Sequence, residues 1–85
     1  MSDVGEVRLV LFAAAREAAG CSSASLAVSD LATLLAAASN RFGEQFSAVL
    51  ATSRVWVNGD EPADGLATRL RPGDEVAVLP PVSGG

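Results

Sequence analysis

The segment from Leu31 to Phe42 most constrains the fold, because it is the one long stretch with the apolar spacing of an amphipathic helix. Its apolar side chains recur every three or four residues, at Leu31, Leu34, Leu35, Ala38 and Phe42. This spacing predicts a helix with a single apolar stripe, capped by Ser29 or Asp30 and ended by Gly43. Such a helix needs an apolar surface to cover, and the flanking segments read as strands of a sheet.

Strand patterns occur in four places, at residues 6–12, 24–28, 54–58 and 75–79. A short helix is expected over residues 13–19 with Gly20 as its stop, and a helical turn over residues 44–51. Asn58-Gly59 predicts a tight turn into a weak strand or an irregular segment, and a further turn precedes the last strand. The expected fold is α+β, a β-grasp mixed sheet of four to five strands over one main helix. Residues 1–85 then form a single domain, with residues 80–85 as a protruding tail.

Alternation along the strands predicts two different sheet faces. The side chains expected to face the helix are Val7, Leu9, Leu11, Val55, Val57, Val76 and Val78; those expected on the open face are Val10, Phe12, Trp56, Ala77 and Leu79. An exposed apolar group of this size marks a partner site unless loops cover it. If the first and last strands run parallel, Phe12 and Leu79 end at the same edge of the sheet.

Composition excludes several classes of function. The formal charge of −4 and the absence of a basic patch argue against nucleic acid as a partner. No apolar run is long enough to cross a bilayer and no signal core is seen, so a cytoplasmic location is expected. There is no histidine, and Cys21 is the only cysteine, so neither a metal site nor a Cys-His or Ser-His nucleophile is expected. Cys21 reads as an inert loop thiol.

All six cationic side chains are arginine. The absence of lysine fits a codon-composition effect in an alanine-rich chain. It also suits a protein with an activated acyl terminus, which then cannot acylate its own kind through an ε-amine.

The last seven residues, Leu79-Pro80-Pro81-Val82-Ser83-Gly84-Gly85, differ from the rest of the chain. Two prolines remove backbone donors and favour a stiff extended arm, and six residues reach roughly 20 Å when extended. Glycine adds no side-chain bulk at the tip, so the arm suits a narrow channel. The terminal carboxylate is ionised at neutral pH and is a poor electrophile until it is activated, for instance as an acyl adenylate. A frayed terminus is the alternative reading.

Three segments resemble the small subunit of molybdopterin synthase, the MoaD family. They are Phe12-Ala13-Ala14-Ala15-Arg16-Glu17-Ala18-Ala19-Gly20, Val57-Asn58-Gly59, and the run from Pro72 to Gly85, which is the most specific part. The resemblance extends over the whole chain, but residues 1–5 lie outside the matched region, and no role is carried over to residues 60–71, which differ in length and composition among such proteins.

The resemblance implies a sulfur carrier with no catalytic side chains of its own, which acts as the sulfur-donating subunit of a sulfurtransferase complex. A ubiquitin-activating-like adenylyltransferase uses ATP to adenylate Gly85, which becomes a thiocarboxylate, and no other cofactor is bound. The tail enters the large synthase subunit of a heterotetramer and passes sulfur to cyclic pyranopterin monophosphate. By matching position, Gly84 gives access, Phe12 and Leu79 contact the partner, Pro80, Pro81, Val82 and Ser83 form the approach, and Trp56 and Arg16 are additional contacts.

Three alternatives remain open at this point. One is a sulfur carrier of another pathway, such as thiazole synthesis, and another is a ubiquitin-like modifier joined to lysines of other proteins. The third is a non-catalytic β-grasp binding module with an inert tail.

Overall fold

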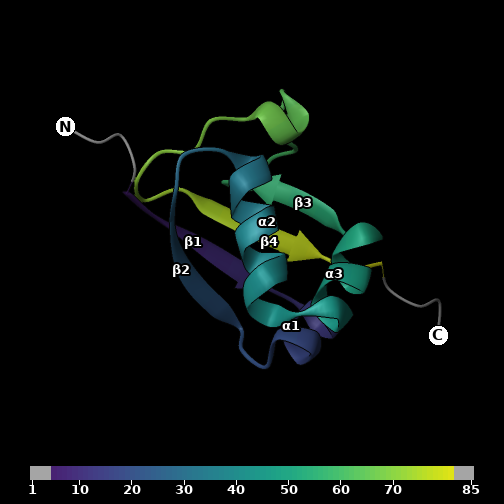
Figure 1. The fold of residues 1–85 in the computed structure, drawn as a ribbon. Helices are drawn as coiled ribbons and strands as arrows, with labels where there is room; N and C mark the ends of the chain where they lie inside the picture. The colour runs from purple at the N-terminus through teal and green to yellow at the C-terminus, as the bar shows by residue number, and fades with distance from the viewer. Residues whose placement is uncertain (1–4, 82–85) are drawn as a thin grey trace.

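The computed structural model describes residues 5–81. Its elements are β1 (Gly5–Leu11), α1 (Ala13–Ala19), β2 (Ser23–Val28), α2 (Leu31–Phe42), α3 (Glu44–Ala51), β3 (Arg54–Val57), the 3-10 turn η1 (Gly65–Ala67) and β4 (Glu75–Leu79). The four strands form one mixed sheet in the order β2-β1-β4-β3, and α2 lies across it (Figure 1). The expected β-grasp arrangement is confirmed, with four strands.

The centre of the sheet joins the first strand to the last. β1 and β4 run parallel with Leu9 opposite Val76 and Leu11 opposite Val78. β2 pairs antiparallel with the outer side of β1, and β3 pairs antiparallel with the outer side of β4. The parallel pairing of the first and last strands, considered from the sequence, is therefore confirmed.

The core lies between the sheet and the helices. It is formed by buried apolar side chains of every strand but β3, of the three α-helices and of the segment before β4: Val7, Leu9, Leu11, Ala15, Val28, Leu31, Leu34, Ala38, Phe46, Leu70, Val76 and Val78. Phe46 of α3 is fully buried, and its ring contacts Phe42 at 5.2 Å between centroids. Val55 and Val57 pack against the core on the helix side of the sheet, as expected. They are only half-buried, because β3 is an edge strand.

The helix boundaries follow from local chemistry. Asp30 caps α2, with its Oδ1 accepting the Thr33 N–H at 2.7 Å, and Gly43 separates α2 from α3. Gly20 ends α1 in the left-handed region at φ 77°, which costs glycine little. The predicted bounds of α1, α2, α3 and β4 agree with the structure.

Two expectations need correction. Asn58, placed in the third strand, lies in the turn at φ 50°, and Phe12, placed in the first, is the N-cap of α1. The weak strand considered after Asn58-Gly59 is absent from the described residues, since this segment instead contains η1. The backbone of the segment pairs with the start of α2, through the Leu31 N–H to Thr68 O and the Leu70 N–H to Ser29 O, both at 2.9 Å.

Candidate docking face

One row of apolar side chains crosses the sheet on the side away from α2. Val10 pairs with Ala77, which pairs with Trp56, so one row spans β1, β4 and β3. The Phe12 N–H donates to Val78 O at 3.3 Å, which places Phe12 next to Leu79 at the end of β4. We call this group the docking face: Val10, Phe12, Trp56, Ala77 and Leu79.

The docking face is partly accessible to solvent. Phe12 is 44% exposed, whereas Leu11 beside it points into the core and is 1% exposed. Val10, Trp56, Ala77 and Leu79 are half-buried. The group is thus more covered than strand alternation alone suggests, and Phe12 is its most prominent member.

The two ends of this side of the sheet differ in polarity. Arg8 pairs with Glu75 at the end where β4 begins, and both side chains are exposed. The apolar side chains gather at the other end, where β4 leads into Pro80 and Pro81. The face is therefore apolar where the chain leaves the sheet.

A strained backbone position follows Phe12. Ala13 has φ 48°, in the left-handed region that costs roughly 1–2 kcal/mol for a residue with a Cβ. The neighbouring backbone is held by hydrogen bonds, because Phe12 O accepts the N–H groups of Ala15 at 3.0 Å and Arg16 at 3.4 Å. This bend turns the chain from β1 into α1 while the Phe12 side chain stays exposed.

The Trp56 side chain contains an unsatisfied donor. Its Nε1 atom is shielded from solvent and has no hydrogen-bond partner among the residues that the structure describes. A shielded donor of this kind costs about 1–3 kcal/mol.

The remaining predicted site residues fall into two groups. Pro80 is half-buried, Pro81 is exposed, and Arg16 is exposed on α1. Val82, Ser83, Gly84 and Gly85 lie outside the described residues. The structure thus brings Phe12, Trp56 and Leu79 together on one face and leads the chain from that face into the two prolines.

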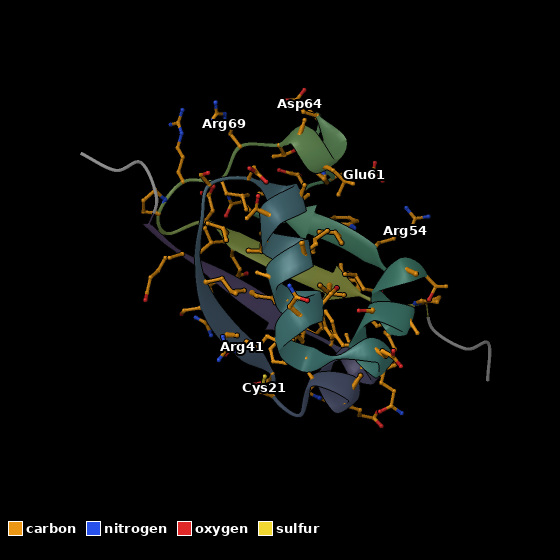
Figure 2. All side chains as sticks on the ribbon, viewed as in Figure 1. Cys21, Arg41, Arg54, Glu61, Asp64 and Arg69 are labelled. Carbon is orange, nitrogen blue, oxygen red and sulfur yellow. The ribbon has the colours of Figure 1, made fainter. Side chains whose placement is uncertain are left out.

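Charged side chains elsewhere form no second site in residues 5–81. No cluster of histidine, cysteine or carboxylate groups there is arranged to hold a metal ion. Among the side chains labelled in Figure 2, Arg41, Asp64 and Arg69 come from different segments of the chain and are exposed. Arg54 and Glu61 form an ion pair at 3.6 Å, but both side chains are 76% exposed, so the pair adds little stability.

Asp30 has a structural role remote from the docking face. The Thr33 backbone N–H, then the Thr33 side chain and the charge of Arg69, hold the pKa of this carboxyl below its usual value. Cys21 is half-buried against the core at the turn before β2. In residues 5–81 no helix is both long and apolar enough to cross a membrane.

Three features of the site were not predicted from the sequence. The left-handed Ala13, the shielded Trp56 N–H and the partial burial of Pro80 depend on contacts between distant segments, and residue type carries no signal for them. The Trp56 indole on the open face was the nearest clue, because alternation placed a large polar-tipped ring there.

Comparison with known proteins agrees with this geometry. The ThiS family profile matches residues 9–85. A solution structure of small archaeal modifier protein 1 from Methanosarcina acetivorans is 28% identical, with a TM-score of 0.85, covering 99% of this chain and 100% of that one. The crystal structure of the Haloferax volcanii protein SAMP1 is 30% identical, with a TM-score of 0.82 and coverage of 95% and 100%.

A third similar structure is a complex. It is subunit 1 of the molybdopterin-converting factor from Helicobacter pylori, solved with subunit 2, at 28% identity, a TM-score of 0.73 and coverage of 94% and 99%. A search of curated protein sequences finds no match. The β-grasp sheet, the docking face at the root of the C-terminal segment and the profile match lead to one conclusion: the chain belongs to the ThiS family and is a ubiquitin-like sulfur carrier.

Proposed function

We propose that this chain is the sulfur-carrying small subunit of a cytoplasmic molybdopterin synthase and serves molybdenum cofactor biosynthesis. The observation that carries the proposal is the parallel pairing of β1 and β4. It sets Phe12 beside Leu79 at the end of the sheet where the chain continues into Pro80-Pro81. A partner that binds this face receives the C-terminal arm at the same place.

The reaction is assigned to Gly85. Its carboxylate is a poor electrophile at neutral pH, so an adenylyltransferase of the ubiquitin-activating type first joins it to AMP from ATP, with release of pyrophosphate. Sulfide-level sulfur from a donor then attacks the acyl carbon, the bond to AMP breaks, and the chain ends in a thiocarboxylate. Gly84 and Gly85 have no Cβ, which lets the arm enter a narrow channel and present the thiocarboxylate to cyclic pyranopterin monophosphate.

The recognition step is assigned to the docking face. Phe12 and Leu79 fill apolar pockets of the large synthase subunit, with Trp56 and Arg16 as additional contacts, and Pro80, Pro81, Val82 and Ser83 guide the arm. The Helicobacter pylori complex of subunits 1 and 2 supports a partner of this kind for a protein of the same fold. The expected assembly is a heterotetramer with two small subunits.

Two further candidates have specific support. Similarity to small archaeal modifier protein 1 favours a ubiquitin-like modifier, in which the activated Gly85 is joined to lysines of other proteins. The ThiS family match favours a sulfur carrier for thiazole synthesis. Both use the same activated Gly85 as the proposed synthase subunit does. The molecule that receives the Gly85 acyl group or its sulfur therefore distinguishes the three functions.

The deciding experiment follows the mass of the intact protein. Incubated with ATP, a sulfur source and the adenylyltransferase, the chain should gain the mass of one oxygen-to-sulfur exchange, located at Gly85 by fragmentation. The loaded chain is then mixed with the large synthase subunit and cyclic pyranopterin monophosphate. Molybdopterin formation with return of the original mass is expected, and an unchanged mass throughout contradicts the proposal.

A deletion of Gly85 is the matched control. It should abolish sulfur loading and synthase activity while the melting temperature and binding to the large subunit stay close to those of the full chain. A stable adduct of Gly85 on lysines of other proteins, with no transfer to the pterin, selects the modifier instead.

A further inference from the structure

Within residues 5–81, the two edges of the sheet differ in how well they are protected. β2 and β3 are the outer strands (Figure 1). On β3, the Val57 N–H donates to Asp60 O at 2.8 Å, and the Val57 carbonyl accepts the Asp60 N–H at 3.1 Å. β3 is also only four residues long and carries the exposed Arg54 side chain. Short edge strands and charged side chains prevent pairing with another chain, so the β3 edge is protected.

The edge formed by β2 directs a run of backbone groups outward. The Leu11 N–H donates to Ser22 O at 2.8 Å, which fixes the hydrogen-bonded pairs of the ladder between β1 and β2. Such pairs alternate with non-hydrogen-bonded pairs in an antiparallel ladder. Every second residue of β2 therefore directs its N–H and carbonyl groups away from β1: Ser23, Ser25 and Ala27. Residues 5–81 supply no backbone partner for these groups.

β2 lacks the features that protect an edge strand. Its six residues include no proline and no charged side chain. On the side of the sheet away from α2, its side chains are small and exposed. An edge of this kind is a template on which a further strand can pair.

Charged side chains of β1 lie beside this edge in a pattern that complements itself. On the side away from α2, Arg8 pairs with Ser25 and Glu6 pairs with Ala27. Arg8 and Glu6 are exposed, and neither forms an ion pair within residues 5–81. A two-fold axis beside Leu26 would set Ser25 of one copy opposite Ala27 of a second copy. Each row across the joined sheets would then carry Arg8 at one end and Glu6 of the other copy at the opposite end, with only small side chains between them.

We propose that the β2 edge pairs antiparallel with the β2 edge of a second copy of this chain, with the two Leu26 residues opposite each other. This register makes about four backbone hydrogen bonds between the copies, two for each pair of Ser25 with Ala27. The Leu26 pair is of the non-hydrogen-bonded type, in which side chains lie closest, and each half-buried leucine covers the other. A shifted register with Ser25 opposite Ser25 would place Arg8 at both ends of one row, where like charges repel.

This dimer leaves the docking face accessible. The axis lies beside Leu26, whose partner on β1 is Val7, whereas Phe12 follows the other end of β1. Trp56 and Leu79 belong to β3 and β4, on the opposite half of the sheet from β2. A single strand edge is a small interface, so the dimer is weak and reversible. The inference goes beyond the proposed function and does not depend on the chemistry assigned to Gly85.

Sedimentation equilibrium of the full chain from about 10 µM to 1 mM tests the dimer, since small interfaces associate weakly. Wild type should pass reversibly from monomer to dimer in this range. Ser25→Pro removes an outward N–H that the β1–β2 ladder does not use, and it should weaken association at least about tenfold. Ala27→Lys keeps every backbone group and adds a charge to the edge, so it should have the same effect even if proline disturbs the strand. Melting temperatures show that each variant is folded.

Charge exchange identifies the register. Arg8→Glu sets two carboxylates at the ends of each row and should weaken the dimer about three- to tenfold, and the double variant Glu6→Arg/Arg8→Glu should restore it. Phe12→Asp is the control for association through the docking face and should dimerise as wild type does.

Three results would overturn the proposal. They are a wild-type chain that stays monomeric at about 1 mM, wild-type affinity in a folded Ala27→Lys variant, and no recovery in the double variant. Loss of association in Phe12→Asp would also overturn it, because the docking face would then join the copies. The assay uses neither an activating enzyme nor a sulfur source, so its failure is distinct from failure of the proposed function.

Discussion

Asn58 offers the sharpest test of how the sheet is held together. It has φ 50°, and its Oδ1 accepts the Glu75 N–H at 2.9 Å while its Nδ2 donates to Asp74 Oδ1 at 3.1 Å. Asp74 Oδ2 in turn accepts the Arg71 N–H at 2.8 Å. One amide side chain thus ties the turn after β3 to the turn before β4.

The expected cost of Asn58→Ala has two parts. Loss of two solvated hydrogen bonds costs about 1 kcal/mol in all, at the low end of the usual range for each. Alanine in the left-handed region adds about 1 kcal/mol, since asparagine tolerates this conformation better. The sum of about 2 kcal/mol corresponds to a fall in melting temperature of roughly 8–16 °C for a domain of this size.

Asn58→Gly separates the two parts. Glycine accepts the positive φ, so it should lose only the hydrogen bonds and fall between alanine and wild type. Urea unfolding followed by far-ultraviolet circular dichroism measures the three free energies. Ordinary surface substitutions change the free energy of unfolding by up to about 0.5 kcal/mol. If both variants stay within that range of wild type, the Asn58 side-chain hydrogen bonds do not stabilise the fold.

Three other expectations concern the docking face, the α2 cap and a close backbone approach. Phe12→Asp should leave the fold intact, because the side chain is 44% exposed, but weaken binding to the large synthase subunit about tenfold or more by titration, with Phe12→Leu as control. Equal affinities of Phe12→Asp and wild type contradict this. The lowered pKa of Asp30 means that its contribution to stability is present above the unfolded value of 3.8 and is lost as pH falls through the folded value. Asp30→Asn should flatten the acid side of the melting-temperature curve, and identical acid slopes would refute this. Gly5→Ala should destabilise by about 1–3 kcal/mol in urea, because its Cβ would clash with both Cγ and Cβ of Pro72, and the loss should largely disappear in a Pro72→Gly background, which lacks both atoms. A Gly5→Ala variant as stable as wild type would show that the ring moves freely.

Local signals predicted much of this fold from the sequence. Gly20, Asp30 and Gly43 mark helix ends through their own backbone or side-chain chemistry, so the bounds of α1 and α2 were found correctly. The last strand was equally clear, because a turn precedes it and prolines follow.

The segment between Asn58 and the last turn could not be predicted in the same way. Its backbone partners are Leu31 and Ser29 at the start of α2, and nothing within the segment indicates them. The residues of the docking face were predicted correctly, but the exposure of each side chain was not. Alternation assigns a side to each residue, whereas the exposure of Phe12 depends on the bend at Ala13.

The parallel pairing of β1 and β4 also orders events during synthesis of the chain. Phe12 follows the first strand and Leu79 closes the last, so the docking face does not exist until almost the whole chain has been made. Closing the sheet across about 65 residues costs loop entropy that local contacts do not offset, which makes this pairing a late step in folding. A chain cut short before β4 has neither the face nor the arm, and recognition by a partner therefore reports completed folding as well as identity.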